Sequence, residues 1–264
     1  MLRGASAEAH QELADRLAGA SQTPEVGEEL FGVAGVLRGE PALRRVVTDA
    51  SIEGSAKAAL AGNVFGGSVG ETTLELVKDA VQRRWTAGRD LADVLELLGV
   101  VSLVQSSGDE GGRISDELFE VRRVIDGQAD LRSALSDPSR SKADKNGLLR
   151  GLFEGKVQSA TLLLVGQALD GTHGAIDRGL VEFQNLAAEA KGEKIATVHT
   201  ARELSSDERE RLTAALSRQY GTSVHLQVVL DPEVVGGLRV AIGDDVIDGT
   251  VSGKLEDAQR KLAG

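Results

Sequence analysis

The sequence predicts a mostly helical α+β protein, with two tandem helical bundles followed by a small mixed α/β domain. A stretch over residues 29–80, the first copy, repeats without a gap over 117–168, the second copy, at an offset of 88 residues and with more than a third of the pairs identical. A fixed period indicates one supersecondary unit used twice. Apolar residues recur at helical spacing up to about residue 190, and from Glu193 the pattern alternates as in strands.

The composition limits the possible functions. Aromatic residues make up only 3% of the 264 residues, so the cores must be aliphatic, as in helix bundles. The net charge of −11, without a basic stripe, argues against binding of nucleic acid or anionic lipid. The sequence has no cysteine and no apolar run of membrane-spanning length, so we expect neither thiolate chemistry nor direct membrane insertion.

The first bundle is predicted over residues 1–105. Thr23 before Pro24 marks a helix start, and Gly39 marks its end. The segment 89–105 is the most apolar helix of the chain and is apolar on more than one face, so we expect both bundles to share it as a wall. The expected helices of this bundle span about 6–19, 24–37, 41–47, 52–64, 70–84 and 89–105.

The second bundle is predicted over residues 106–190, together with helix 89–105. The segment 106–112, SSGDEGG, is the best candidate for a linker, because glycine, serine and aspartate favour irregular backbone. The expected helices of this bundle span about 113–126, 128–135, 140–152, 155–169 and 172–190.

The third domain is predicted over residues 191–264, with the element order β-α-β-β-β-α. Ser205 and Glu208 have the spacing of a capping box, and Gly221 is placed to end the helix that follows. The expected strands span about 194–200, 224–230, 237–242 and 245–247, and the expected helices 206–219 and 251–262.

No residue set predicts a catalytic, cofactor-binding or metal site. The four histidines are scattered, and although His199 and His225 could face each other across neighbouring strands, the pair would not make a metal site. The acidic cluster at 244–248 fits a turn better than a cation site. The glycine pairs at 66–67 and 236–237 lack the lysine and spacing of a phosphate loop, so we expect no nucleotide binding.

A dense motif lies near the C-terminus, where residues 236–255 read GGLRVAIGDDVIDGTVSGKL. It resembles the C-terminal signature of the F-type ATP synthase delta subunit, the family that includes the mitochondrial oligomycin-sensitivity-conferring protein. Residues 92–264 resemble an ordinary delta subunit, and the extra first copy resembles the long bacterial form with a duplicated N-terminal helical domain. The motif residues are Gly236, Gly237, Arg239, Gly243, Asp244, Asp248, Gly249 and Lys254.

The resemblance implies a non-catalytic peripheral-stalk subunit, or stator. Such a subunit links the alpha/beta catalytic head to the membrane-anchored b subunit, resists rotor torque and needs no cofactor. It would lie at the cytoplasmic face of a bacterial membrane, held peripherally through protein contacts. A helical-repeat adaptor unrelated to ATP synthase is the alternative function that the sequence leaves open.

The resemblance also implies partner-binding surfaces. In the family, an N-terminal helix of an alpha subunit lies between the first and fifth helices of the bundle, and the C-terminal domain meets the end of b. Carried onto this chain, the two helices are the segments 91–104 and 157–169. Each side chain of this candidate groove fits an ordinary core position equally well. The groove residues are Val94, Leu98, Val101, Ala160, Leu163 and Leu164.

Overall fold

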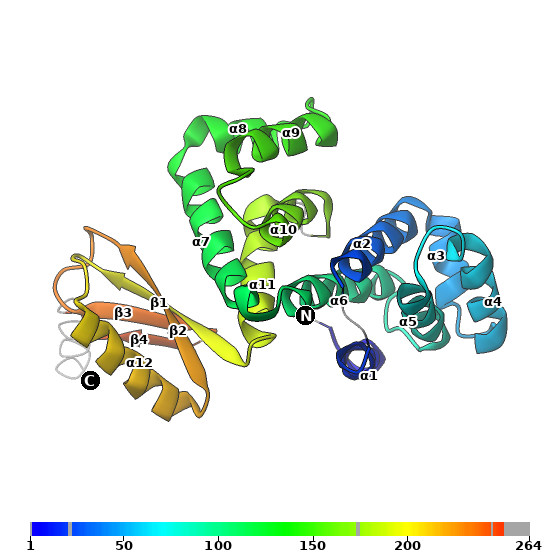
Figure 1. Ribbon diagram of the computed structural model, residues 1–264, viewed down its shortest axis with the longest axis horizontal. Helices are drawn as coiled ribbons and strands as arrows, with labels where there is room; N and C mark the ends of the chain where they lie inside the picture. Colours follow the sequence, from blue (N-terminus) through cyan, green and yellow to red (C-terminus); the bar gives the residue numbers. More distant parts are fainter. Residues whose placement is uncertain (1, 21–22, 173–174, 244, 251–264) are drawn as a thin grey trace, which may run out of the picture. The chain divides into compact units, whose positions relative to one another are not determined.

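The computed structural model describes residues 2–20, 23–172, 175–243 and 245–250 of the chain. It divides into two compact units, Met1–Ala187 and Ala188–Gly264. The first unit is built of helices, and the second contains a four-stranded sheet with helix α12 (Ser206–Tyr220) (Figure 1). The described residues therefore confirm the predicted class, a mostly helical α+β protein.

Helices α1 to α6 contain the first copy together with the segments before and after it. Pro24 and Pro41 lie in the first turns of α2 and α3. A backbone N–H at that position has no partner within the helix, so proline, which lacks the N–H, loses no hydrogen bond there. The bounds are α1 (Ala5–Ala18), α2 (Pro24–Gly39), α3 (Pro41–Thr48), α4 (Gly54–Phe65), α5 (Glu71–Gln82) and α6 (Asp90–Ser106).

Helices α7 to α10 contain the second copy, and α11 follows it. Helices α3, α4 and α5 begin and end 88 residues before α8, α9 and α10. The connection before α4 also recurs, because Asp49 Oδ1 accepts hydrogen bonds from the backbone and hydroxyl of Ser51, as Asp137 Oδ1 does from Ser139 before α9. The bounds are α7 (Gly111–Gly127), α8 (Ala129–Ser136), α9 (Lys142–Phe153), α10 (Ser159–Asp170) and α11 (Ile176–Glu189).

Helix α6 is enclosed by other helices. It packs on α1, α2 and α5 and also contacts α7 and α10. Helices α6 and α2 cross closely at two glycines. A Cβ at Gly27 would lie 2.9 Å from the Gly99 carbonyl oxygen, and a Cβ at Gly99 would lie 3.0 Å from the Gly27 carbonyl oxygen. Burial on several sides explains why α6 is apolar on more than one face. Its fully buried leucines are Leu91, Leu95, Leu98 and Leu103.

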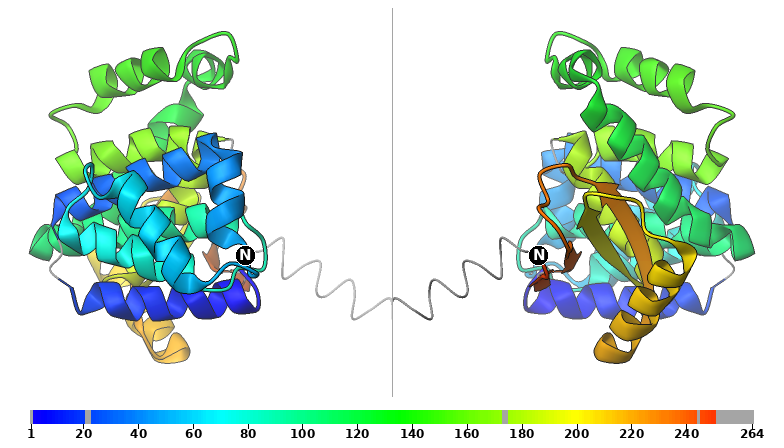
Figure 2. Two further views of the ribbon diagram at one scale, coloured as in Figure 1. Left: turned by 90° about the vertical axis from the view of Figure 1, so that its right-hand side faces the viewer. Right: turned by 90° about the vertical axis from the view of Figure 1, so that its left-hand side faces the viewer.

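The second unit pairs its strands in the order β2-β1-β3-β4. Strand β1 (Glu193–Thr200) runs parallel to β2 (Ser223–Leu230) and antiparallel to β3 (Leu238–Ile242), and β4 (Asp245–Asp248) lies at the edge. Helix α12 covers one face of the sheet (Figure 2). The core residues between helix and sheet are Ala196, Val198, Leu216, Val224, Val240 and Ile242.

The local signals around α12 are confirmed. Ser205 and Glu208 form the predicted capping box, in which each side chain accepts from the backbone N–H of the other residue. Gly221 ends the helix with a left-handed backbone, φ 67°. The helix predicted at 251–262 lies outside the described residues.

Two expectations from the sequence are wrong. The segment 106–112 is not an irregular linker, because α6 reaches Ser106, a 3-10 turn spans Gly108–Glu110, and α7 begins at Gly111. Gly111 is buried, so packing outweighs its weak helix propensity. His199 and His225 are not opposite each other, because the parallel register pairs His225 with Ile195.

The described helices differ from membrane spans in length or in composition. In that part of the chain, no single helix has both the length and the apolar composition of a span. The segments Asp90–Ser106 and Gly108–Gly127 satisfy both criteria only when taken together, and they are bent by 118°.

Candidate partner-binding surfaces

The six candidate groove residues divide between the core and the surface. Val94, Leu98 and Leu164 are fully buried within the chain, and Val94 and Leu98 belong to the main hydrophobic core. Val101, Ala160 and Leu163 are partly exposed. Of the six, Leu163 lines the groove described next, and the partner-binding role of the set stays a prediction.

The groove that Leu163 lines has a volume of about 760 Å³ and lies between α9 and α10, with α2 at its edge. Apolar side chains form much of its surface, and four charged side chains stand among them. The apolar lining is Phe31, Ala143, Leu149, Val157, Leu162 and Leu163, and the charged lining is Glu28, Arg150, Glu154 and Asp170. A groove with an apolar lining and a charged rim suits an amphipathic helix.

A buried polar cluster connects α2, α6 and the end of α10. Glu96 is 1% exposed, and its carboxylate accepts hydrogen bonds from Arg38 Nη2 at 2.8 Å and Arg38 Nη1 at 3.2 Å. The hydroxyl of Thr172 donates to the same carboxylate at 2.9 Å, and Gln167 Nε2 donates as well. Gly171 is required beside it, because a Cβ there would overlap the Glu96 carboxylate.

The sequence contains one signal for this cluster that the predictions did not use. Glu96 is a carboxylate flanked by leucines in the most apolar helix of the chain. A buried carboxylate requires a cation or several donors nearby, so its presence there implies a partner. The sequence could not identify that partner, because Arg38 is 58 residues away from Glu96.

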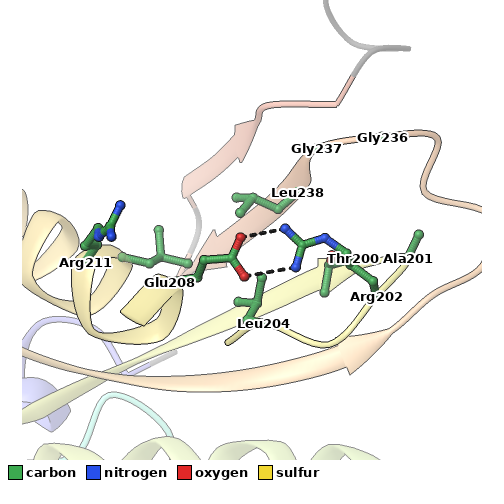
Figure 3. Close-up of a pocket in the computed structure, with 10 residues that line it drawn as sticks. Thr200, Ala201, Arg202, Leu204, Glu208, Arg211, Gly236, Gly237 and Leu238 are labelled. Atoms are coloured by element: carbon green, nitrogen blue, oxygen red, sulfur yellow. Dashed lines mark hydrogen bonds and ion pairs between the residues drawn. The ribbon is translucent and has the colours of Figure 1, made fainter. Parts of the chain in front are cut away.

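A pocket of about 550 Å³ lies in the second unit (Figure 3). Arg202 and Glu208 point toward each other in it and form a bidentate pair, with Nη1 2.9 Å from Oε2 and Nη2 2.5 Å from Oε1. The combination of apolar contacts and guanidinium donors suits the docking of a protein segment. The full lining is Thr200, Ala201, Arg202, Leu204, Glu208, Arg211, Leu212, Gly236, Gly237 and Leu238.

Hydrogen bonding lowers the pKa of Glu208 from 4.5 to about 2. The first cause is the hydrogen bond from the Arg202 guanidinium, and the backbone N–H of Ser205 adds a second. Both donors stabilise the charged carboxylate. The pair therefore stays ionised throughout the physiological pH range.

The C-terminal motif builds a strand corner beside this pocket. Gly236 and Gly237 have φ of 64° and 78°, and a Cβ on Gly237 would overlap the Gly249 carbonyl oxygen, so this approach of backbone to backbone requires glycine. Asp248 lies opposite Arg239 in the ladder, and its Oδ1 accepts from the backbone of Thr250 at 2.9 Å.

The remaining motif residues are partly outside the described range. Gly243 forms the turn between β3 and β4 with φ 56°. Asp244 and Lys254 are not among the described residues. The predicted contact of the C-terminal domain with the end of b stays a prediction. Among the residues that the structure describes, no group of three or more His, Asp or Glu side chains is placed to hold a metal ion.

Comparison with known proteins identifies the family. The profile of the ATP synthase delta (OSCP) subunit matches residues 100–262. A protein of Nocardioides sp. named ATP synthase subunit delta is 50% identical over 100% of this chain and 98% of its own length. Proteins of the same name from Thermobifida fusca and Streptomyces coelicolor are 38% and 37% identical over 95% and 99% of this chain, and over 94% and 98% of their own lengths. With half of its positions identical to a relative over the whole length, the chain belongs to the ATP synthase delta (OSCP) subunit family.

Proposed function

We propose that this chain is the non-catalytic peripheral-stalk subunit of an F-type ATP synthase. In this role it links the alpha/beta catalytic head to the membrane-anchored b subunit and resists the torque of the rotor. The observation that carries the proposal is the match to delta subunits over the full length of the chain, both helical copies included. The alternative of an adaptor unrelated to ATP synthase finds no support in these relatives.

We propose a division of the chain into three functional regions, 1–105, 106–190 and 191–264, with helix 89–105 shared by the first two. The repeat of helix bounds at an offset of 88 residues supports this division. So does the packing of α6 on helices of both copies.

The helical unit would bind the N-terminal helix of an alpha subunit, and the C-terminal unit would bind the end of b. The groove between α9 and α10 supports the first assignment, since its mixed lining suits an amphipathic helix. The pocket at Arg202 and the C-terminal motif support the second. These contacts would hold the chain at the cytoplasmic face of the membrane.

Affinity purification from the source bacterium tests this proposal. A tagged copy of the chain, expressed in place of the native one, is expected to retain alpha, beta and b subunits after detergent extraction. Washing the membranes at low ionic strength should release the chain together with the catalytic head. If the tagged chain recovers neither alpha nor b from solubilised membranes, the proposed function is wrong.

Two assays on the purified chain add independent checks. Vesicles of anionic lipid without protein should not retain it, because the chain carries a net charge of −11. Calorimetry with micromolar ATP should show no binding heat. Tight vesicle binding would contradict attachment through protein contacts, and ATP binding would contradict a role without nucleotide.

A further inference from the structure

We propose that the polar cluster around Glu96 is a joint that fixes the two helical copies to each other, so that helices α1 to α10 form one rigid body. The joint lies where α2 of the first copy contacts α10 of the second, beside the helix α6 that packs on both (Figure 1). This rigidity is a property of the helical unit itself and does not depend on which protein the chain binds.

Glu96 collects hydrogen-bond donors from both copies. Arg38 of α2 donates to its carboxylate from Nη1 at 3.2 Å and from Nη2 at 2.8 Å. At the end of α10, Gln167 Nε2 and the backbone N–H of Thr172 donate to the same carboxylate. The Thr172 hydroxyl lies 2.9 Å from Glu96 Oε2 and 2.7 Å from Asp93 Oδ1, so it donates to one of them. Hydrogen bonds to charged groups are strong and geometrically specific, so this set favours one placement of α10 on α2.

The centre of the joint is shielded from water. The Glu96 side chain is 1% exposed, and the side chains of Arg38 and Asp93 are each 23% exposed. Moving α10 away would remove donors from a carboxylate that stays buried, where water has little access to replace them. An exposed ion pair would instead exchange its partner for water at little cost. The cluster therefore resists small movements of one copy against the other.

Gly171, between α10 and Thr172, shows that the chain leaves space for this contact. Its backbone has φ −80° and ψ −155°, which any residue adopts. Arg83 follows α5 at the same place of the repeat, with φ −72° and ψ 166°, so the backbone there accepts a long side chain. A Cβ at Gly171, however, would overlap the Glu96 carboxylate. The glycine is therefore required by the joint and not by the backbone.

The joint extends from the end of α10 to α9. Asp170, the last residue of α10, accepts from Asn146 Nδ2 on α9 at 2.8 Å. Lys142 at the start of α9 donates to the Asp170 carbonyl oxygen at 3.1 Å, and its Nζ lies 3.5 Å from Asp170 Oδ1. The end of α10 is thus held by α6 and α2 on one side and by α9 on the other. A probe on α9 therefore reports on the joint.

Distance measurement between two spin labels tests the proposal on the full-length chain. The sequence has no cysteine, so introduced cysteines take up the labels without background. Asn63→Cys on α4 and Gly151→Cys on α9 place labels at exposed, equivalent positions of the two copies. A second pair, Arg123→Cys on α7 with Gly151→Cys, measures a distance within the second copy.

Two variants open the joint by different means. Glu96→Gln removes the charge with little change in shape, and Gly171→Ala adds a methyl group against Glu96 without changing a charge. Asp79→Asn is the matched control. Asp79 is also a largely buried carboxylate, 14% exposed, that accepts from two guanidiniums, but those of Arg16 and Arg83 belong to α1 and the end of α5. Circular dichroism establishes that each variant is folded.

The wild type should give one narrow distribution of distances between the copies. Glu96→Gln and Gly171→Ala should each widen it about twofold, while Asp79→Asn leaves it unchanged. The distance within the second copy should stay narrow in all variants. A broad distribution in the wild type, or an unchanged width in both joint variants, would overturn the inference. So would equal widening within the second copy, because α9 and α10 would then have loosened without movement between the copies.

Discussion

The carboxylate of Glu117 accepts a hydrogen bond from the hydroxyl of Thr161 at 2.5 Å. The same carboxylate oxygen accepts from the backbone N–H of Gln158, the residue that precedes α10, so a side chain of α7 caps another helix. The first copy contains the same arrangement, in which Glu29 accepts from Thr73 and from the backbone of Gly70 before α5. Each carboxylate satisfies a free N–H at a positive helix end.

Replacing this cap should destabilise the helical unit. Glu117→Ala is expected to lower the free energy of unfolding by about 1–2 kcal/mol, because the buried Thr161 hydroxyl and a helix N–H lose their acceptor. Urea unfolding followed by circular dichroism measures the change. Glu120→Ala, whose side chain is 59% exposed, is the control and should cost no more than about 0.5 kcal/mol. Equal losses in the two variants would contradict the capping role.

The buried pair of Arg38 and Glu96 should respond asymmetrically to substitution. Arg38→Met is expected to cost about 2–3 kcal/mol, because Glu96 is then left buried without its cation. Adding Glu96→Gln to that variant should restore part of the loss, since a neutral amide is less costly to bury than a charge. Thermal unfolding of the two variants measures this difference. A double variant less stable than Arg38→Met alone would show that the charge is not the source of the loss.

A charge in the apolar part of the groove should weaken partner binding. Leu163→Asp is expected to reduce affinity for the alpha N-terminal peptide by about tenfold or more, because a carboxylate would be desolvated against the apolar face of the peptide. Fluorescence anisotropy of a labelled peptide gives the dissociation constant. Val181→Asp on α11 places the same charge on a partly exposed valine outside this groove, and should leave the affinity unchanged.

The pair of Arg202 and Glu208 gives a pH prediction. Because the pKa of Glu208 is lowered from 4.5 to about 2, its contribution to folding is complete above pH 4.5 and is lost as the pH falls toward 2. Carbon-detected NMR of the Glu208 carboxyl should give a midpoint near 2, and Arg202→Met should raise it toward 4.5. Arg209→Met removes a neighbouring guanidinium that donates to the Leu204 carbonyl, and should leave the midpoint in place.

Removing the first copy tests the independence of the second. A fragment of residues 89–264 is expected to fold, although it should be less stable because the side of α6 that packs on α2 becomes exposed. Circular dichroism and thermal unfolding provide the measurement. An unfolded fragment would mean that the second bundle depends on the first for its structure.

Local signals in the sequence predicted local structure well. The capping box at Ser205 and the helix stop at Gly221 depend on residues a few positions apart, so their pattern is readable in one dimension. The linker prediction at 106–112 was wrong because the burial of Gly111 is a property of tertiary packing. The strand register that separates His199 from His225 is likewise set by pairing between distant segments.

The candidate site was harder to predict than the fold. Leu163 lines the groove, but the sequence alone could not distinguish it from Leu164, its fully buried neighbour. Phe31, which also lines the groove, is separated from α9 and α10 by more than 100 residues of chain, so nothing in its sequence neighbourhood links it to them. Grooves arise where distant elements meet, and periodicity describes only one element at a time.

The packing of α6 on both sides has a consequence for how its length can vary. One residue inserted in the middle of the helix would rotate everything after it by about 100° and shift it by about 1.5 Å along the axis. Leu91 packs in the core that α6 shares with the first copy, and Leu103 lies against Gly27 on α2. After such an insertion, the two leucines could not both keep these contacts. Insertions and deletions should therefore accumulate in the loops of these proteins, while the residue count of α6 stays constant.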